Sequence, residues 1–400
     1  MGNKGISAKI KVGIITLYHG NYNFGGLLQA YALPAAIKQY LGIAAEQIDY
    51  VYMSEKQIET KDKSSIKKTI YEAVYIVFTK LKKKKLARRK NAFEQFREFI
   101  PHSKRTYECD SISDSNKIYT KFICGGDQIW NDYHIVQWYR SIDSKVFTLQ
   151  FVPENVKKIS YAPSMAVLEL TDEFRKEFSE EIKRFDAISV REKKTLSVMK
   201  QMTNKTITIA ADPVLLLQES DWLKVMRYSK KRKQYVLCYL LGDSTEQRKV
   251  VEKFAAKNNY KVIVFPHIVH NAIRKCDLFF GDIHDYSSGP REFLGLINNA
   301  EFVITDSFHA CVFSMIFKTP FVVFERNKPG EKGNMNSRIY DFLEEYHLEN
   351  QLVTEKKLAD MKEIPKLDFT YAHEHWKKRR EESLEFLKNA LMDNQNGEER

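Results

Sequence analysis

The segment from residue 9 to residue 40 reads KIKVGIITLYHGNYNFGGLLQAYALPAAIKQY. It begins with a β-branched apolar run that ends at Leu17, continues through a glycine-containing loop at 19–26, and then shows a helical pattern over 27–40. A strand, a loop and a helix in this order are typical of the first unit of an α/β fold. The segment therefore predicts a parallel sheet with crossover helices.

The same succession of strand and helix recurs in two series along the chain. The first series is expected to contain strands at 121–124, 157–162 and 187–190 and a helix at about 172–185 that Thr171 opens. The second is expected to contain strands at 235–241, 261–266, 302–305 and 320–324 and helices at about 244–258, 290–299 and 308–317. Ser244 is the expected cap of the first of these helices.

Two series of this length predict an α/β protein with two Rossmann-like domains that face a cleft. The first domain is expected at 1–228, with a basic helical insertion at about 64–100, and the second at 229–400, with its final helix as a candidate to return to the first domain. Ligands of such sheets bind beyond the carboxyl ends of the strands. Functional residues are therefore expected in the loops at 18–26, 124–131, 190–192, 305–309 and 325–338.

Positive charge is concentrated in one segment. The net charge is +12, and residues 80–90, KLKKKKLARRK, contribute eight positive charges and no negative ones, which leaves +4 for the rest. This distribution argues against a nucleic-acid-binding protein, which would be basic over a whole face. The segment at 70–96 fits either a solvated surface helix or an interfacial helix that binds anionic lipid headgroups.

Several other chemistries lack a sequence signal. The five cysteines contain no CxxC pair, so neither a disulfide framework nor a thiolate zinc site is expected, and His267 and His270 have no further ligands beside them. There is no GxxxxGK[ST] motif and no GxGxxG motif after a strand. No metal is expected. The start of the chain shows no signal-peptide pattern, and a cytoplasmic location is expected.

The segment Asp306-Ser307-Phe308-His309 joins an expected strand to an expected helix. Free N–H groups and the helix dipole at such a junction favour an anion, with Asp306 or Ser307 as the cap. A bound anion would favour protonated His309, which is then a candidate general acid. The alternative is a structural histidine that bonds to a backbone carbonyl.

Three arginines follow expected strands. Arg326 and Arg338 come after the strand at 320–324, and Arg191 comes directly after the strand at 187–190. A guanidinium group suits a carboxylate or a phosphate because it can donate two parallel hydrogen bonds. The alternatives are solvated loop arginines and, for Arg191, an ion pair with Glu192 or another acid.

Two glycine-containing loops are candidates for binding a sugar. Gly125 and Gly126 allow a tight turn that carries Asp127 outward, and Trp130 follows in the same loop. Carboxylate and amide groups bind sugar hydroxyls, and an indole packs on the apolar face of a sugar. A simple turn with a buried Trp130 is the alternative. The Gly-Gly pair before Gln29 is the second, weaker candidate.

These loops together resemble the polysaccharide pyruvyl transferase family. The similar segments occur in order: NFGGLLQAYAL (23–33), CGGDQIWN (124–131), ISYAPSMA (159–166), ISVREK (188–193), ADPVLLL (211–217) and VITDSFHACVFSMIFKTPFVVF (303–324). The departures from the family pattern are Phe24, Gly126, Pro163 and Ala310-Cys311. They affect acceptor loops and packing more than the His309 and Arg191 positions.

The resemblance implies a glycosyltransferase-B-like fold with an acceptor side in the first domain and a donor side in the second. It implies transfer of a pyruvyl group from phosphoenolpyruvate to a sugar, usually as a ketal, with phosphoenolpyruvate as co-substrate and no further cofactor. The acceptor is often a lipid-linked glycan, which favours a peripheral position of residues 80–90 on the inner face of the membrane. No nucleic-acid partner is expected.

The candidate residues fit this reaction. His309 is the expected acid that protonates the methylene carbon, and Asp127 is a candidate base by its type and location. The expected donor-binding residues are Arg191, Ser307, Arg326 and Arg338. The expected acceptor-binding residues are Asn23, Gly25, Gly26, Gln29, Gln128 and Trp130.

Two other function classes share many of these features. A nucleotide-sugar-dependent glycosyltransferase of the same architecture would release a nucleoside diphosphate and not inorganic phosphate. A non-catalytic glycan-binding protein would bind without turnover. Product analysis separates the three classes.

Overall fold

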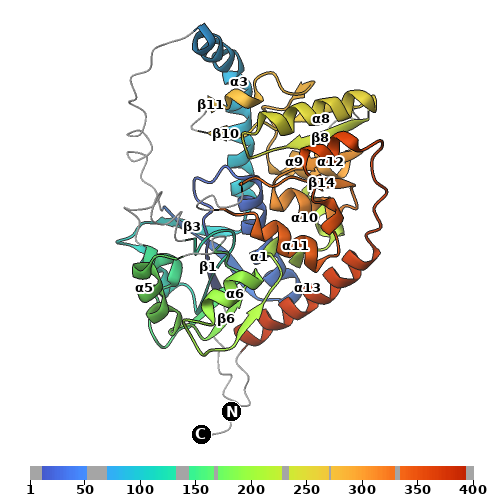
Figure 1. The fold of residues 1–400 in the computed structure, drawn as a ribbon. Coiled ribbons are helices and arrows are strands. Elements are labelled where there is room, and N and C mark those ends of the chain that lie inside the picture. The colour runs from blue at the N-terminus through green and yellow to red at the C-terminus, as the bar shows by residue number, and fades with distance from the viewer. Residues whose placement is uncertain are drawn as a thin grey trace, which may run out of the picture.

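The computed structural model describes residues 11–51, 70–131, 144–165, 170–227, 234–269, 272–328 and 334–392. Figure 1 shows two α/β lobes, one built around each sheet, with the long helix α3 (Ile70–Phe99) extending beyond them at the top.

The first sheet is parallel and contains seven strands in the order β3-β2-β1-β4-β5-β6-β7. Its strands are β1 (Lys11–Ile15), β2 (Ala44–Tyr50), β3 (His102–Tyr107), β4 (Lys121–Gly125), β5 (Lys157–Tyr161), β6 (Ala187–Val190) and β7 (Ile207–Ile209). The central strands are buried along their length, as expected for a sheet with helices on both faces. The polar strands β2 and β3 were not predicted, because AAEQIDY and HSKRTY lack the apolar runs of the others.

The second sheet is also parallel, with five strands in the order β12-β9-β8-β13-β14. Its strands are β8 (Tyr235–Tyr239), β9 (Lys261–Val264), β12 (Ile283–His284), β13 (Phe302–Thr305) and β14 (Phe321–Val323). A small antiparallel hairpin, β10 (Ile268–Val269) and β11 (Ala272–Ile273), lies outside it. Two parallel sheets with crossover helices confirm the predicted fold class.

The other α-helices are α1 (Phe24–Leu41), α5 (Asp172–Ile182), α6 (Lys193–Met199), α7 (Glu219–Val225), α8 (Thr245–Lys257), α9 (Pro290–Asn298), α10 (Phe308–Ile316), α11 (Ser337–Glu345), α12 (Glu355–Asp360) and α13 (Thr370–Leu391). The two predicted caps are confirmed: Thr171 accepts from the N–H of Phe174, and Ser244 accepts from the N–H of Gln247. Helix α11 begins at Ser337, directly after Asn336.

Two helices connect the lobes. The final helix α13 packs against α1 and also against α10, and the indole N–H of Trp376 donates to the carbonyl of Leu215 at 2.7 Å. The inner part of α3 packs against α1 and α9, with Phe93 against Phe24 at 4.8 Å between ring centroids. One hydrophobic cluster contains residues of both lobes, so apolar packing holds the two sheets in place around the site.

Candidate active site

Segments that follow strands of both sheets meet between the lobes. The first sheet contributes the loops after β4, β6 and β7, and the second contributes α10 after β13 and α11 after β14. The charged side chains that they bring together are Asp127, Arg191, Glu192, Asp212, His309 and Arg338. Of these, the sequence predicted Asp127, Arg191, His309 and Arg338 as site residues.

Arg191 lies buried among three carboxylates. Its Nη1 donates to Asp212 Oδ2 at 2.6 Å, its Nη2 to Asp127 Oδ1 at 3.0 Å, and its Nε to Glu192 Oε1 at 2.9 Å. Burial alone would lower the pKa of Arg191, but the carboxylates raise it well above its usual value. The ion-pair alternative from the sequence is therefore what the structure shows, and Nη2 becomes available to a ligand only when Asp127 moves.

Asp127 joins Arg191 to Arg338. Its Oδ1 also accepts from Arg338 Nη1 at 2.6 Å, so one carboxylate oxygen lies between two guanidinium groups. Burial acts to raise the pKa of Asp127, but the charges of Arg338 and Arg191 outweigh it and hold this pKa far below the usual range. An ionised carboxylate in this position occupies the place where a carboxylate or phosphate of a ligand would bind.

His309 lies in the first turn of α10, with only 5% of its surface exposed. Its Nε2 is 3.7 Å from Asp212 Oδ2, and the face of its ring lies against Gly25 at the start of α1. Burial lowers the pKa of His309, and the nearby Asp212 and Asp127 only partly compensate. The imidazole is therefore neutral at neutral pH, and a bound anion would favour its protonation.

Three buried nitrogen atoms around this cluster lack a hydrogen-bond partner among the described residues. His309 Nε2, Arg338 Nε and Arg326 Nε are buried and form no hydrogen bond with the residues that the structure describes. An unsatisfied buried polar group costs about 1–3 kcal/mol, so such atoms are unusual away from ligand sites. A cavity of about 30 Å³ lies beside Arg338 and is lined by Arg191, Asp212, Phe308, Arg338 and Asp341, among others. It has room for water but not for a substrate.

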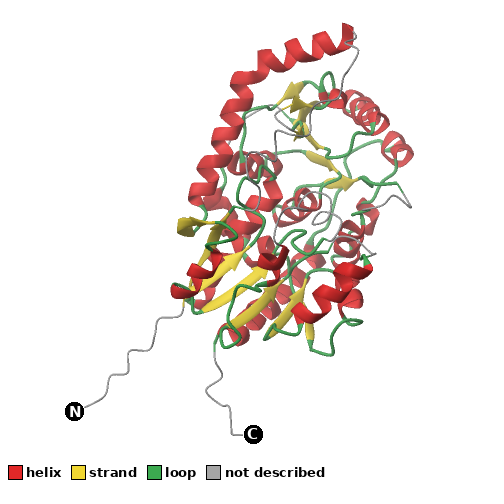
Figure 2. Cartoon of the chain, turned by 90° about the vertical axis from the view of Figure 1, so that its left-hand side faces the viewer, coloured by secondary structure: helices red, strands yellow, loops and turns green. Residues whose placement is uncertain are grey.

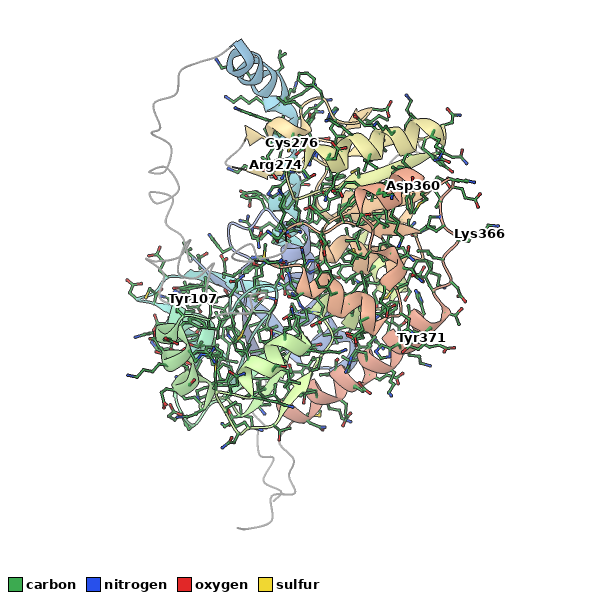
Figure 3. The ribbon with its side chains drawn as sticks, in the orientation of Figure 1. Tyr107, Arg274, Cys276, Asp360, Lys366 and Tyr371 are labelled. Carbon is green, nitrogen blue, oxygen red and sulfur yellow. The ribbon has the colours of Figure 1, made fainter. Side chains whose placement is uncertain are left out.

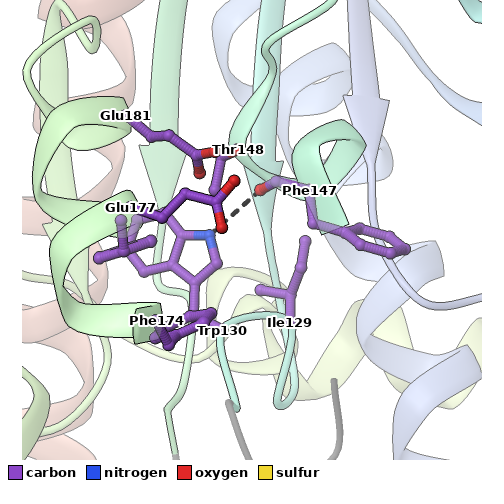
Figure 4. A pocket seen from close by; sticks show the side chains of 8 residues that line it. Ile129, Trp130, Phe147, Thr148, Phe174, Glu177 and Glu181 are labelled. Atoms are coloured by element: carbon purple, nitrogen blue, oxygen red, sulfur yellow. Dashed lines mark hydrogen bonds between the residues drawn. The ribbon is translucent and has the colours of Figure 1, made fainter. Parts of the chain in front are cut away.

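Trp130 is not available to a sugar. Its side chain is 1% exposed, its ring packs against Phe178 at 4.9 Å between centroids, and its N–H donates to the carbonyl of Phe147 at 3.1 Å. Figure 4 shows the indole enclosed between α5 and the segment of Phe147, with Glu177 and Glu181 beside it. The prediction that Trp130 binds the acceptor is therefore wrong, and the alternative of a turn with a buried tryptophan is correct.

The other expected acceptor residues support the site from behind. Asn23 caps α1 by accepting from the N–H of Gly26, and the buried Gln29 donates to Thr16 and to the carbonyl of Gly26. Gln29 also lies directly against Gly126, whose φ of 106° only glycine adopts readily. Gln128, at a φ of 57°, accepts from Asn131 within its own loop. These residues form contacts within the protein, so a direct sugar contact for Asn23, Gly25, Gly26 or Gln29 is not supported.

Ser307 and Arg326 lie on the side of the second sheet. Ser307 precedes α10, but its side chain forms no capping hydrogen bond. The side chain of Asp306 instead accepts from the N–H groups of Leu241 and Gly242 after β8, at 2.7 and 2.6 Å. Arg326 Nη2 donates to the carbonyl of Asp306 at 2.9 Å, which leaves the unpartnered Nε near the cleft.

Two carboxyl groups of the site, Asp212 and Asp341, were not predicted, and Glu192 was named only as an alternative partner of Arg191. Glu192 and Asp212 hold Arg191, and Asp341 lines the small cavity with its Oδ2 free of hydrogen bonds. Burial raises the pKa of Asp341, and the charge of Glu192 raises it further. The position of Asp212 three residues after the end of strand β7 and before a proline was a usable signal, because it too follows the carboxyl end of a strand.

The sequence was compared with known families and proteins. The model of the polysaccharide pyruvyl transferase family matches residues 23–328, which is more than half of the chain and includes all of the cluster except Arg338. The chain belongs to the polysaccharide pyruvyl transferase family. Membership makes it a transferase of polysaccharide biosynthesis and implies a glycan acceptor. No curated protein matches the chain in sequence.

Solved structures resemble this pyruvyl transferase family member in fold. A UDP-GlcNAc 2-epimerase from Neisseria meningitidis has 10% identity and a TM-score of 0.44, with 94% of this chain and 98% of that chain covered. A putative UDP-N-acetylglucosamine 2-epimerase from Listeria monocytogenes has 12% identity and a TM-score of 0.43, with 92% of this chain and 94% of that chain covered. A wall teichoic acid polymerase has 12% identity and a TM-score of 0.44, with 94% of this chain and 89% of that chain covered.

The described residues show neither a membrane-spanning helix nor a metal-binding cluster. Among the helices that the structure describes, none is long and apolar enough to cross a membrane. Within the same residues, no group of three or more histidine, cysteine, aspartate and glutamate side chains is arranged to hold a metal ion.

Proposed function

We propose that this protein transfers a pyruvyl group from phosphoenolpyruvate to a sugar of a polysaccharide repeat unit, forming a pyruvate ketal and releasing phosphate without a further cofactor. The observation that carries this proposal is the Asp127 carboxylate between Arg191 and Arg338, next to the unpartnered Nε2 of His309. A carboxylate that accepts hydrogen bonds from two arginines marks a site for an anion of similar shape.

Phosphoenolpyruvate matches this arrangement in charge and size. It carries a carboxylate and a phosphate on the same carbon, C2, and the cluster offers Arg338, Arg191 and the nearby Arg326 as separate donors. Arg338 Nε and Arg326 Nε would gain the hydrogen bonds that they now lack. In this proposal the donor displaces Asp127 and lies beside His309, on the side of the second sheet.

The reaction requires one proton at the methylene carbon. We assign this proton to His309 Nε2, which the bound dianion would keep protonated. The C3 atom gains that proton, C2 forms bonds to two sugar oxygens, and the bond from C2 to the phosphate oxygen breaks. Of the two hydroxyl protons, one restores His309 and the other leaves with the phosphate, so the atoms and charges balance.

Asp127 is a poor candidate for the base that the sequence suggested, because its lowered pKa makes it a weak proton acceptor. We expect Asp127→Asn to retain turnover within about tenfold and to lower the KM for phosphoenolpyruvate by up to about tenfold, since the amide competes less for the two arginines. Steady-state kinetics of this variant beside Asp114→Asn, an exposed carboxylate paired with Lys117 in the same lobe, provides the measurement. A loss of 10²-fold or more in kcat at unchanged KM would restore Asp127 as the base.

The function itself is tested by incubating the protein with phosphoenolpyruvate and a panel of free and lipid-linked glycosides. Release of inorganic phosphate together with a product mass that corresponds to a pyruvate ketal supports the proposal. Release of a nucleoside diphosphate from a nucleotide sugar would identify a glycosyltransferase instead. Binding of glycans with no product from any donor would identify a binding protein.

We also propose that α3 attaches the protein to an anionic membrane surface. Arg89 points into the protein with 7% of its surface exposed, so seven of the eight cations in residues 80–90 remain for this role. Most of them are exposed, Leu81 between them is 74% exposed, and the nearest acidic residue that follows is Glu94. Figures 1 and 2 show that this part of α3 extends along the edge of the molecule away from the first sheet. The side chains of Tyr71, Tyr75 and Phe78, which were expected to add apolar contacts, lie outside the described residues.

Vesicle co-sedimentation tests this attachment. Each lysine near an anionic surface contributes up to about 1 kcal/mol, so replacing Lys82, Lys83, Lys84 and Lys85 with Gln is expected to abolish binding to anionic vesicles. Binding of the parent protein should weaken as salt is added and should be absent on neutral vesicles. The triple exchange of Lys249, Lys253 and Lys257 to Gln, on the exposed face of α8, is the matched control and should bind as the parent does. Equal binding of the α3 variant and the parent would show that the segment is a solvated helix.

A further inference from the structure

Three arginines form a row along the carboxyl edge of the second sheet, and we call Arg89, Arg274 and Arg326 the arginine row. Each donates to a backbone carbonyl that follows a different strand of this sheet. The carbonyl partners after β9, β8 and β13 are Pro266, Leu240 and Asp306, at 2.8, 2.8 and 2.9 Å. Because these three strands are neighbours and adjacent strands lie about 4.8 Å apart, the guanidinium groups follow one another along the edge.

The members of the row come from segments far apart in sequence. Arg89 belongs to α3, Arg274 directly follows β11, and Arg326 follows β14. Figure 3 labels Arg274 in the upper lobe, where Ile273 packs with Leu86 of α3 in a small hydrophobic cluster. One end of the row is therefore Arg326, near Arg338, and the other end is Arg89, on the basic helix α3.

The row holds more positive charge than its carboxylates neutralise. Asp277 is shared between Arg274 and the buried Arg248, and Asp306 lies 3.8 Å from Arg326 Nε without a hydrogen bond to it. Arg89 has no ion pair with any described residue, and its guanidinium lies 5.0 Å from the ring of Phe24. Burial lowers the pKa of Arg89 to about 10, although Asp285 and Asp277 act in the opposite direction.

Two neutral side chains face the row without hydrogen bonds to described residues. One is His267, directly after Pro266, and the other is the hydroxyl of Tyr239 at the end of β8. Burial, followed by the charges of Arg274, Arg326 and Arg89, lowers the pKa of His267 to about 4, with Asp277 as the opposing carboxylate. Burial raises the pKa of Tyr239 to about 12, so its hydroxyl keeps its proton. Both groups can donate to an anion, His267 through one N–H when it is neutral and through both ring nitrogens when it is protonated.

We infer that the arginine row, with His267 and Tyr239, binds the diphosphate that links the acceptor sugar to a lipid carrier, an inference that rests on the proposed function. Several cations in line suit a diphosphate, whose charge is spread over two phosphorus groups. The donor is assigned to Arg338, Arg191 and His309, with Arg326 at the point where the donor and the row meet, and Arg274 and Arg89 lead away from the donor. The acceptor sugar would then extend from the row toward His309.

The position of Arg89 favours a lipid as the carrier. Arg89 lies four residues after Lys85 and seven after Lys82 on the same helix, which corresponds to about 6 and 10 Å along its axis. A diphosphate bound at Arg89 therefore lies within about 10 Å of the lysines proposed to contact the membrane. A lipid tail spans such a distance readily, so the sugar can reach the cleft while the tail remains in the bilayer.

The binding experiment uses the full-length protein with ¹³C-labelled histidine and follows the imidazole resonances by NMR at neutral pH. His267→Gln and His309→Gln assign the two signals. Inorganic pyrophosphate is expected to move the His267 signal and to raise its apparent pKa toward its usual value, because an anion favours the protonated ring. Phosphoenolpyruvate is expected to move the His309 signal and to leave that of His267 in place.

The variant Arg274→Gln is expected to raise the pyrophosphate concentration for half-maximal effect by about tenfold or more. Phosphoenolpyruvate should still move the His309 signal in this variant, which shows that the site remains folded. Arg105→Gln, which removes an exposed arginine of the first lobe, is the charge-matched control. A short prenyl diphosphate should bind more tightly than a nucleoside diphosphate.

Two results would overturn the inference about the row. If pyrophosphate leaves the His267 signal unchanged at millimolar concentration, the row binds no diphosphate. If phosphoenolpyruvate moves the His267 signal as far as pyrophosphate does, the row belongs to the donor site. Tighter binding of the nucleoside diphosphate would overturn the lipid carrier. Since none of these readouts needs turnover, a protein that binds pyrophosphate at His267 but makes no ketal would contradict the proposed function and leave the subsite intact.

Discussion

Exchange of His309 for glutamine is expected to reduce turnover by about 10²–10⁴-fold, the usual contribution of a positioned general acid. The reason lies in the unpartnered Nε2 of His309, the atom that we propose to donate the proton to the methylene carbon. Glutamine retains a polar side chain of similar length but cannot supply a proton at neutral pH. The KM for phosphoenolpyruvate should change much less than kcat, because Arg191 and Arg338 remain.

The measurement is steady-state phosphate release by the variant, with circular dichroism and thermal unfolding to establish that it folds. The matched control is His102→Gln, which alters a histidine that bonds to the carbonyl of Ile100 outside the site. Turnover of the His309 variant within a few-fold of the parent would remove His309 from the mechanism. It would direct attention to Asp341, whose carboxyl has a raised pKa and lines the small cavity beside Arg191 and Arg338.

The titration of His309 gives this prediction a second, independent readout. In the free protein, burial places the pKa of His309 below its usual value, so the ring takes up a proton only as the pH falls well below neutrality. Binding of phosphoenolpyruvate adds negative charge beside the ring and must raise this pKa. NMR titration should therefore show a larger protonated fraction at neutral pH with the donor than without it. An unchanged or lower pKa in the complex would contradict the role of general acid.

The location of the site could be predicted from the sequence because it depends on local pattern. Each of Asp127, Arg191 and His309 follows a buried apolar strand, and the carboxyl ends of parallel strands meet at one edge of a sheet. That rule needs only the position of the strands. It therefore places these residues together although they are 64 or more positions apart in the chain.

The roles of individual side chains could not be predicted in the same way, because they depend on which groups lie opposite each other across the cleft. A tryptophan in a polar loop fits a sugar or a core equally well, and only the position of Phe178 on α5 decides that Trp130 is buried. The partners of Arg191 come from three separate segments, so its full set of ion pairs was not visible in any one motif. The same holds for the row of Arg89, Arg274 and Arg326.

The site also shows how the free protein keeps its cations stable without a substrate. Two buried arginines near each other would be costly, and Asp127 compensates by accepting from both. The loop that carries it turns at Gly126 and Gln128, both at positive φ. We therefore regard Asp127 as a group that holds the anion site in place until the donor binds.

Introduction of a single methyl group at Gly25 is expected to inactivate the enzyme almost as completely as the loss of His309. A Cβ at this position would overlap the imidazole of His309, with no other direction in which to point, because Gly25 lies in the first turn of α1. Either the ring must leave its position or the two lobes must separate. Displacement of a catalytic group by about 1 Å costs on the order of 10²-fold in rate, and overpacking of this kind costs about 1–3 kcal/mol of stability.

The adjacent glycine provides the matched control for Gly25→Ala. A Cβ at Gly26 would approach only the side-chain amide of Asn21, at 2.6 Å from its Nδ2, and that group can rotate away. Gly26→Ala is therefore expected to keep turnover within about tenfold, since the side chain of Asn21 donates to the carbonyl of Leu17, accepts from the N–H of Asn23 and has no hydrogen bond to a charged group of the site. Phosphate release and thermal unfolding of the two variants should thus differ sharply although each adds the same methyl group to the same helical turn. Equal activity of the two variants would mean that the contact between Gly25 and His309 does not position the imidazole, and that α1 supports the site only through its packing.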